Sequence, residues 1–160
     1  MNDEVFDFEA TLAEALAAID VGPHCSCAEV TAEVLRRAIA MESPVLQFAA
    51  AGFGGGLAGS GSICGAFSAG IVAIGMVLGE RERSEGCISE TIAPVIQAYY
   101  DDWIDRHGSV LCSSLTGYAS MRDENIRDEF FAGGGQERCT DNYIRFAVER
   151  TLQVVNARRE

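Results

Sequence analysis

The chain has 160 residues, a length that predicts one domain, residues 1–160, able to bury a core without disulfides. Acidic residues outnumber basic ones 24 to 12, giving a net charge of −12, which argues against nucleic acid and anionic membrane surfaces as partners. Every basic residue is an arginine, so chemistry that needs a lysine, such as a Schiff base or a P-loop, is excluded.

Apolar residues at spacings of three and four predict amphipathic helices along most of the chain. The expected helices cover residues 5–19, 30–39, 46–51, 95–104, 126–131 and 144–155. No alternating run and no hairpin signal occurs, so the predicted fold class is all-α. The acidic segment at residues 1–7 has no basic region typical of a secretory signal, which favours a cytoplasmic location.

The middle of the chain differs in composition from the rest. No charged residue lies between Glu42 and Glu80, and residues 63–78 are apolar around the whole circumference of a helix. A transmembrane hairpin is the alternative, but the run is short and lacks a Lys/Arg-rich flank. We therefore expect a single-domain helical bundle around a central buried Gly/Ala-rich helix, and no membrane contact.

A glycine-rich stretch precedes this central helix. Gly54, Gly55 and Gly56 begin a formal GxGxxG match, which makes them candidate cofactor-binding residues. A dinucleotide fingerprint requires a preceding strand, whereas residues 46–51 look helical. Glycines that serve a tight turn are therefore the simpler interpretation.

Four of the six cysteines fall near predicted helix starts. The expected positions are Cys27 first after the capping-box serine Ser26, Cys64 second after Ser62, Cys112 third after Ser109, and Cys139 near the first turn of the last helix. Free backbone N–H groups and the helix dipole stabilise a thiolate there, so we expect a lowered pKa for all four thiols. The alternative for each is a small buried apolar residue.

The two histidines are too few for a multi-histidine metal site within one chain. His24, beside Cys25, is interpreted as an exposed loop residue. His107 is interpreted as a favourable partner of a helix C-terminus.

The sequence also resembles a known family through several landmarks in order. They are Cys27-Ala28-Glu29-Val30, Phe53-Gly54-Gly55-Gly56, Ile63-Cys64-Gly65-Ala66-Phe67-Ser68-Ala69-Gly70, His107-Gly108-Ser109-Val110-Leu111-Cys112 and Cys139. Together they resemble, over residues 22–155, the C_GCAxxG_C_C family of redox-active proteins, which is named for its cysteines rather than for a settled reaction. Ala69 stands where the family motif closes with glycine, and Cys25 and Cys87 match none of the four family positions.

The resemblance implies a redox role. Through the non-haem part of split-Soret cytochromes it implies an iron–sulfur cluster, [2Fe–2S] or [4Fe–4S], whose metal ligands are Cys27, Cys64, Cys112 and Cys139. The chain contains no CxxCH, so covalent c-type haem attachment is excluded.

Three interpretations of the thiols remain open. The first, which we favour, is the cluster, used for electron transfer to a redox partner protein or for sensing. The second is a thiol–disulfide protein in which Cys64 pairs with Cys27 or Cys112. The third is a non-redox binding module or homodimer, in which Tyr99, Tyr100 and Trp103 would face the partner, although aromatic residues at helical spacing usually belong to the core.

Overall fold

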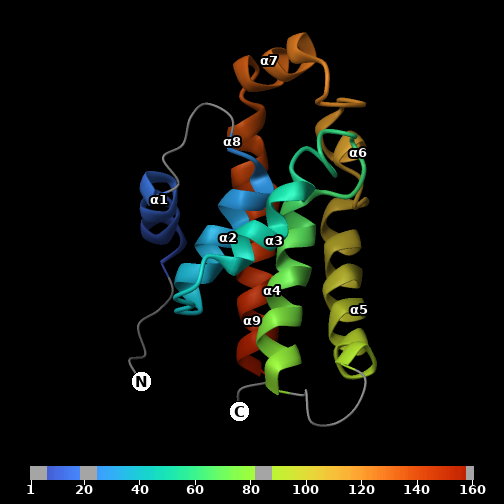
Figure 1. Ribbon diagram of the computed structural model, residues 1–160. Coiled ribbons are helices and arrows are strands. Elements are labelled where there is room, and N and C mark those ends of the chain that lie inside the picture. Colours follow the sequence, from blue (N-terminus) through green and yellow to red (C-terminus); the bar gives the residue numbers. More distant parts are fainter. Residues whose placement is uncertain (1–6, 19–24, 82–87, 158–160) are drawn as a thin grey trace.

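The computed structural model describes residues 7–18, 25–81 and 88–157 (Figure 1). Within these ranges the protein is all-α, as predicted, and contains no β-strand. The elements are α1 (Phe8–Ala18), α2 (Cys27–Ala38), α3 (Val45–Ala50), the 3₁₀ turn η1 (Ala51–Phe53), α4 (Gly65–Arg81), α5 (Ile88–His107), α6 (Cys112–Thr116), α7 (Glu124–Ala132), α8 (Gly135–Cys139), the π-helical turn η2 (Thr140–Ile144) and α9 (Arg145–Ala157).

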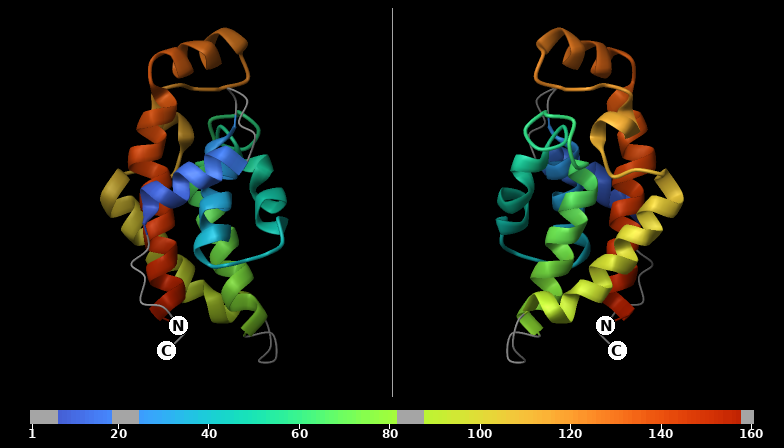
Figure 2. Two further views of the ribbon diagram at one scale, coloured as in Figure 1. Left: turned by 90° about the vertical axis from the view of Figure 1, so that its left-hand side faces the viewer. Right: turned by 90° about the vertical axis from the view of Figure 1, so that its right-hand side faces the viewer.

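Helix α4 lies at the centre of the bundle and packs against α2, α3, α5 and α9 (Figures 1 and 2). Its alanines and Ile74 are fully buried, as expected for the predicted central helix. The burial is not complete around the circumference, because Ile71, Val72 and Met76 are only half-buried. No described helix combines the length and apolar character needed to cross a bilayer.

Aromatic rings fill the space between α4 and α5. Tyr99 and Trp103 are completely buried, and the Phe67 ring stacks on Tyr99 with 5.2 Å between centroids. The Trp103 indole N–H donates to the Ser109 carbonyl over 2.8 Å. Tyr99 and Trp103 therefore belong to the core, as expected for aromatic residues at helical spacing, and of the three rings only Tyr100 is exposed.

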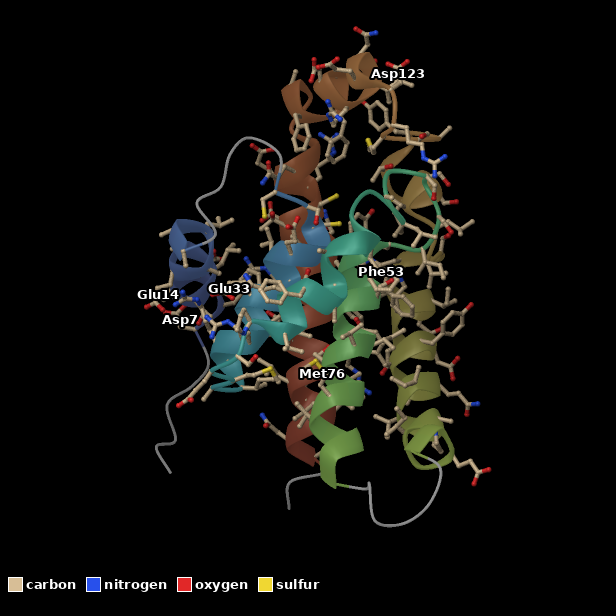
Figure 3. All side chains as sticks on the ribbon, viewed as in Figure 1. Asp7, Glu14, Glu33, Phe53, Met76 and Asp123 are labelled. Atoms are coloured by element: carbon tan, nitrogen blue, oxygen red, sulfur yellow. The ribbon has the colours of Figure 1, made fainter. Side chains whose placement is uncertain are left out.

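Helix α2 connects the outer helix α1 to the core. The Glu33 carboxylate is buried and accepts hydrogen bonds from Arg36 and Arg37, while Arg37 also reaches Glu14 of α1 over 3.3 Å (Figure 3). Two guanidinium groups compensate the burial of this charge and hold the pKa of Glu33 below its usual range. The network keeps α2 in one orientation against its neighbours.

The first turn of α2 has the predicted capping box. The Ser26 hydroxyl accepts from the Glu29 N–H over 3.3 Å, and the Glu29 carboxylate accepts from the Ser26 N–H over 3.1 Å. The hydroxyl also donates to that carboxylate over 2.7 Å. These bonds place Cys27 at the first position of the helix.

Replacing Ser26 by alanine is expected to lower the free energy of unfolding by about 0.5–2 kcal/mol, because the Glu29 N–H loses its acceptor and the Glu29 carboxylate loses the hydroxyl donor. Urea unfolding followed by far-UV circular dichroism measures the change. Ser114→Ala, an exposed serine inside α6, is the matched control. Equal stability of the two variants would contradict a contribution from the cap.

Candidate redox site

Cysteine sulfurs from distant parts of the sequence gather around one cavity. Cys27, Cys112 and Cys139 line a cavity of about 350 Å³, and Cys64 lies next to it, joined to Cys27 by a hydrogen bond between the thiols. Figure 3 shows side-chain sulfurs near the start of α2, below α7. The structure thus brings together the four cysteines singled out from the sequence.

Cys27 is the most strongly hydrogen-bonded of these sulfurs. The Cys64 thiol and the backbone N–H groups of Gly55, Gly65 and Ala66 point to its sulfur, and together they outweigh burial and lower its pKa to about 7. A Cβ atom on Gly65 would lie 2.9 Å from this sulfur, so a glycine is required for the approach of α4. Cys27 is therefore the thiol that ionises first.

Cys64 lies one residue before α4 rather than at its second position. Ile63 and Leu111 form an isolated β-bridge, and the Cys64 N–H donates to the Val110 carbonyl over 2.8 Å. These contacts keep the chain extended past Ser62, so the helix starts later than predicted. Cys64 is buried, and its hydrogen bond to Cys27 and its burial raise its pKa well above the usual value.

Cys112 is the first residue of α6, not the third. The expected cap, Ser109, instead accepts a hydrogen bond from the Leu111 N–H over 3.0 Å, and no side chain caps the helix. The Cys112 N–H donates to the Ser62 carbonyl over 2.6 Å, which ties α6 to the segment before α4. Burial raises the pKa of Cys112 to about 11.

Cys139 is the last residue of α8, which continues through the π-helical turn into α9. Burial, together with the charges of Cys27 and Cys112, raises its pKa to about 12. The expected lowering of the pKa is therefore found at Cys27 and is wrong for Cys64, Cys112 and Cys139. Burial is the largest cause at Cys112 and Cys139, the hydrogen bond to Cys27 is the largest cause at Cys64, and Cys139 is not at a helix start.

The glycine-rich stretch passes directly over the cysteine-bearing segments. Gly55 and Gly56 have φ angles of +61° and +72°, which L side chains rarely adopt. A Cβ atom on Gly56 would lie 2.6 Å from the Cys112 Cβ, and one on Gly54 2.6 Å from the Ser26 Cβ. These glycines therefore serve a tight turn and close packing, and cofactor binding by them stays a prediction.

Several residues at the site had no signal in the sequence. Cys25 also lines the cavity, and burial and the nearby Glu29 carboxylate raise its pKa to about 11. Arg122 and Arg127 line the cavity from the segment before and within α7. That segment has no glycine or cysteine motif, so only the folded structure places it here.

His107 does not act as a charged partner of the α5 C-terminus. Its ring packs against Trp103, Tyr143 and Phe146, and burial and the neighbouring Arg106 lower its pKa, which favours the neutral ring. His24 and Cys87 lie outside the described residues. In the part of the chain that is described, no three His, Cys, Asp or Glu residues are grouped as ligands of one metal ion.

A comparison with known protein families matches residues 25–154 to the family described as "Putative redox-active protein (C_GCAxxG_C_C)". The chain belongs to this family. The match includes all four gathered cysteines and supports a redox role for the C_GCAxxG_C_C protein. Searches of the curated proteins and of the solved structures found no significant match.

Alkylation of the C_GCAxxG_C_C protein should distinguish Cys27 from its neighbours by pH. Because the pKa of Cys27 is lowered to about 7, its labelling by iodoacetamide is expected to rise with a midpoint near pH 7, while Cys112, with a pKa of about 11, stays slow. Peptide mass spectrometry after timed labelling measures both rates. A single shared midpoint above pH 9 would contradict the assignment.

The lowered pKa of Cys27 also predicts how the free energy of unfolding depends on pH. The ordinary pKa of a cysteine thiol is 9.0, and the folded value is lower, so the native thiolate contributes its full stabilisation above pH 9. That contribution decreases as the pH falls from 9 and is lost below about 7.

Removing the Cys64 thiol should raise the pKa of Cys27. Its hydrogen bond is the largest cause of the low pKa of Cys27, so Cys64→Ala is expected to shift the alkylation midpoint upward from about 7 towards 9.0. Cys112→Ala, a matched loss of a buried thiol that donates no such bond, should leave the midpoint near its original value. An unchanged midpoint in Cys64→Ala would show that the backbone N–H groups alone stabilise the thiolate.

Proposed function

We propose that this C_GCAxxG_C_C protein is a thiol–disulfide redox protein in which Cys27 and Cys64 cycle between a dithiol and a disulfide. The observation that carries the proposal is the hydrogen-bonded pair itself: a thiolate with three backbone N–H donors, in contact with a second thiol. A pKa near ambient pH is the value at which thiol exchange is fastest.

The roles of the two sulfurs follow from their positions. Cys27 faces the cavity, so its thiolate attacks one sulfur of a substrate disulfide and displaces the other as a thiolate. Cys64, buried behind it, then attacks the Cys27 sulfur of the mixed disulfide. The proton of Cys64 passes to the departing substrate sulfur. One substrate disulfide is reduced by two electrons, and one Cys27–Cys64 disulfide forms.

Equilibration in glutathione redox buffers tests this proposal. We expect a reversible loss of two thiols per chain and, by peptide mapping, a disulfide between Cys27 and Cys64. Cys112→Ala and Cys139→Ala are matched controls that should keep the disulfide. The absence of reversible thiol loss, or a bridge from Cys27 to another cysteine, would overturn the proposal.

A second candidate is the iron–sulfur cluster. Two further sulfurs, those of Cys112 and Cys139, line the cavity although a single exchange couple does not need them. With Cys27 and Cys64 they would supply four cysteine ligands, the number that such a cluster takes, although no three of these residues are grouped as ligands of a single metal ion in the described chain. A bound cluster would supply one-electron transfer. The N–H groups directed at the Cys27 sulfur would raise the reduction potential of the cluster, because they stabilise its reduced, more negative state.

Anaerobic purification separates the two candidates. A brown preparation containing iron and inorganic sulfide, with both lost in Cys112→Ala and Cys139→Ala, is the result expected for the cluster. An iron-free protein after anaerobic purification and reconstitution with iron and sulfide would remove this candidate and leave the dithiol couple.

A further inference from the structure

The cavity beside Cys27 has the opposite charge character to the rest of the protein. The chain carries a net charge of −12, yet the charged side chains among the residues lining the cavity are two arginines, Arg122 and Arg127. Among the described residues, no aspartate or glutamate belongs to this lining. An acidic protein that places two guanidinium groups in the lining of one cavity favours an anion in that space.

Arg127 has a hydrogen-bond donor in need of a partner. Its Nε atom is buried and has no acceptor within the described part of the chain. A terminal nitrogen of the same guanidinium lies 3.8 Å from the Glu124 carboxylate, a loose ion pair with an exposed side chain. An unsatisfied buried donor costs free energy, so an acceptor on a ligand in the cavity would be stabilised there.

Arg122 lies beside the glycine-rich stretch of the cavity wall. Its Nε donates to the Ala58 carbonyl over 3.4 Å, and its backbone N–H donates to the Ser120 hydroxyl over 3.2 Å. These contacts keep the arginine beside the glycine-rich stretch. The planar guanidinium group offers paired N–H donors that match the geometry of a carboxylate.

The remaining wall limits the kind of anion. Met121, Phe130 and Ile144 present apolar surface, and the volume of about 350 Å³ is at the small end of ligand sites. A ligand that fills this space combines a short apolar chain with an anionic end for the arginines. Cys27 adds a thiolate to the cavity, and a thiolate reacts with a disulfide sulfur of a ligand.

We infer that the cavity binds small disulfides that carry a carboxylate, and that Arg122 and Arg127 hold the carboxylate while Cys27 attacks the sulfur. This inference rests on the proposed thiol–disulfide function and names its substrate class. The exchange steps are those written above. The Cys27–sulfur bond forms as the substrate S–S bond breaks, and the first sulfur leaves as a thiolate. Cys64 then attacks the Cys27 sulfur of the mixed disulfide, and the second substrate sulfur departs with the proton of Cys64.

Three small disulfides of different charge test the inference. Dithiodipropionate carries carboxylates, hydroxyethyl disulfide is neutral and cystamine carries amines. To correct for the intrinsic reactivity of each disulfide, its rate of protein oxidation is divided by its rate of reaction with mercaptoethanol. We expect a preference of about tenfold or more for dithiodipropionate over hydroxyethyl disulfide, and the lowest relative rate for cystamine. Equal relative rates would overturn the inference.

Variants of the two cavity arginines test whether these residues cause the preference for the disulfide that carries carboxylates. Arg122→Gln and Arg127→Gln are expected to lose most of the preference for dithiodipropionate over hydroxyethyl disulfide, because each removes a guanidinium group from the cavity lining. Arg106→Gln, at an exposed position on α5, removes the same charge away from the cavity and should retain the preference. If Arg106→Gln lost the preference for dithiodipropionate to the same extent, the preference would follow from the net charge of the protein, and its assignment to the cavity would be overturned.

A binding measurement separates failure of this inference from failure of the proposed function. Thiodipropionate, a thioether that cannot exchange, is titrated calorimetrically into Cys27→Ala and into Cys27→Ala with Arg127→Gln. Binding to the first and not to the second supports the inference even if no exchange occurs. Normal exchange with hydroxyethyl disulfide, combined with no binding of thiodipropionate and no charge preference, overturns the inference alone.

Discussion

Cys27→Ser is expected to slow oxidation of the protein by hydroxyethyl disulfide at pH 7 by about a hundredfold. At that pH about half of Cys27 is thiolate, because its pKa is about 7, whereas Cys112 and Cys25, with pKa values of about 11, are ionised about 10⁴-fold less. A higher pKa makes a thiolate intrinsically more nucleophilic, by about 10²-fold here, so the expected decrease in rate is about 10²-fold rather than about 10⁴-fold. Thiol counting in stopped-flow samples measures the rate.

The control is Cys112→Ser, which removes a thiol from the same cavity and should change the rate less than about twofold. Circular dichroism and a thermal melt verify that both variants fold. A loss in Cys112→Ser equal to that in Cys27→Ser would show that the first attack does not belong to Cys27 alone.

Local sequence signals located the helices and the position of Cys27 correctly. The apolar spacing of α2, α4, α5 and α9 reflects burial of one face, which the sequence encodes residue by residue. The capping box at Ser26 depends only on groups within four residues, so it too is visible without a fold. The Gly/Ala-rich composition of α4 similarly indicated its central place.

Non-local contacts decided the features that were predicted wrongly. Cys64 and Cys112 shift in position because Ile63 and Leu111 pair across the chain, a contact without a local signal. The raised pKa of Cys112 comes mainly from burial, and that of Cys64 from its bond to Cys27 and burial. A helix start favours thiolate in isolation, but the surrounding side chains decide whether the charge is kept.

The site therefore has one strongly stabilised negative charge rather than four. Backbone N–H donors gather at Cys27, while the other sulfurs around it keep their protons. Such an arrangement is what a two-thiol exchange couple requires, because the second thiol must hold a proton until the mixed disulfide forms. A cluster would need all four sulfurs as thiolates at once, so its binding would have to displace three protons against burial.

Gly70→Ala in α4 is expected to destabilise the protein by overpacking. A Cβ atom there would overlap the Tyr99 hydroxyl and lie 2.8 Å from the Thr151 Oγ1, at the point where α4, α5 and α9 meet. Tyr99 would have to move, and its hydrogen bond to the Phe67 carbonyl, 3.4 Å long, would break. Overpacking of this kind lowers the free energy of unfolding by about 1–3 kcal/mol.

Gly75→Ala in the same helix is the matched control. Its added Cβ would meet only the Ile92 Cδ1 at 3.9 Å, an ordinary contact, so the gain in helix propensity should raise the free energy of unfolding by about 0.5–1 kcal/mol. Urea unfolding followed by the fluorescence of Trp103, the single tryptophan, measures both variants. Opposite signs for the two glycines are expected because only Gly70 lies where three helices touch; equal signs would show that α5 and α9 yield readily at Tyr99 and Thr151.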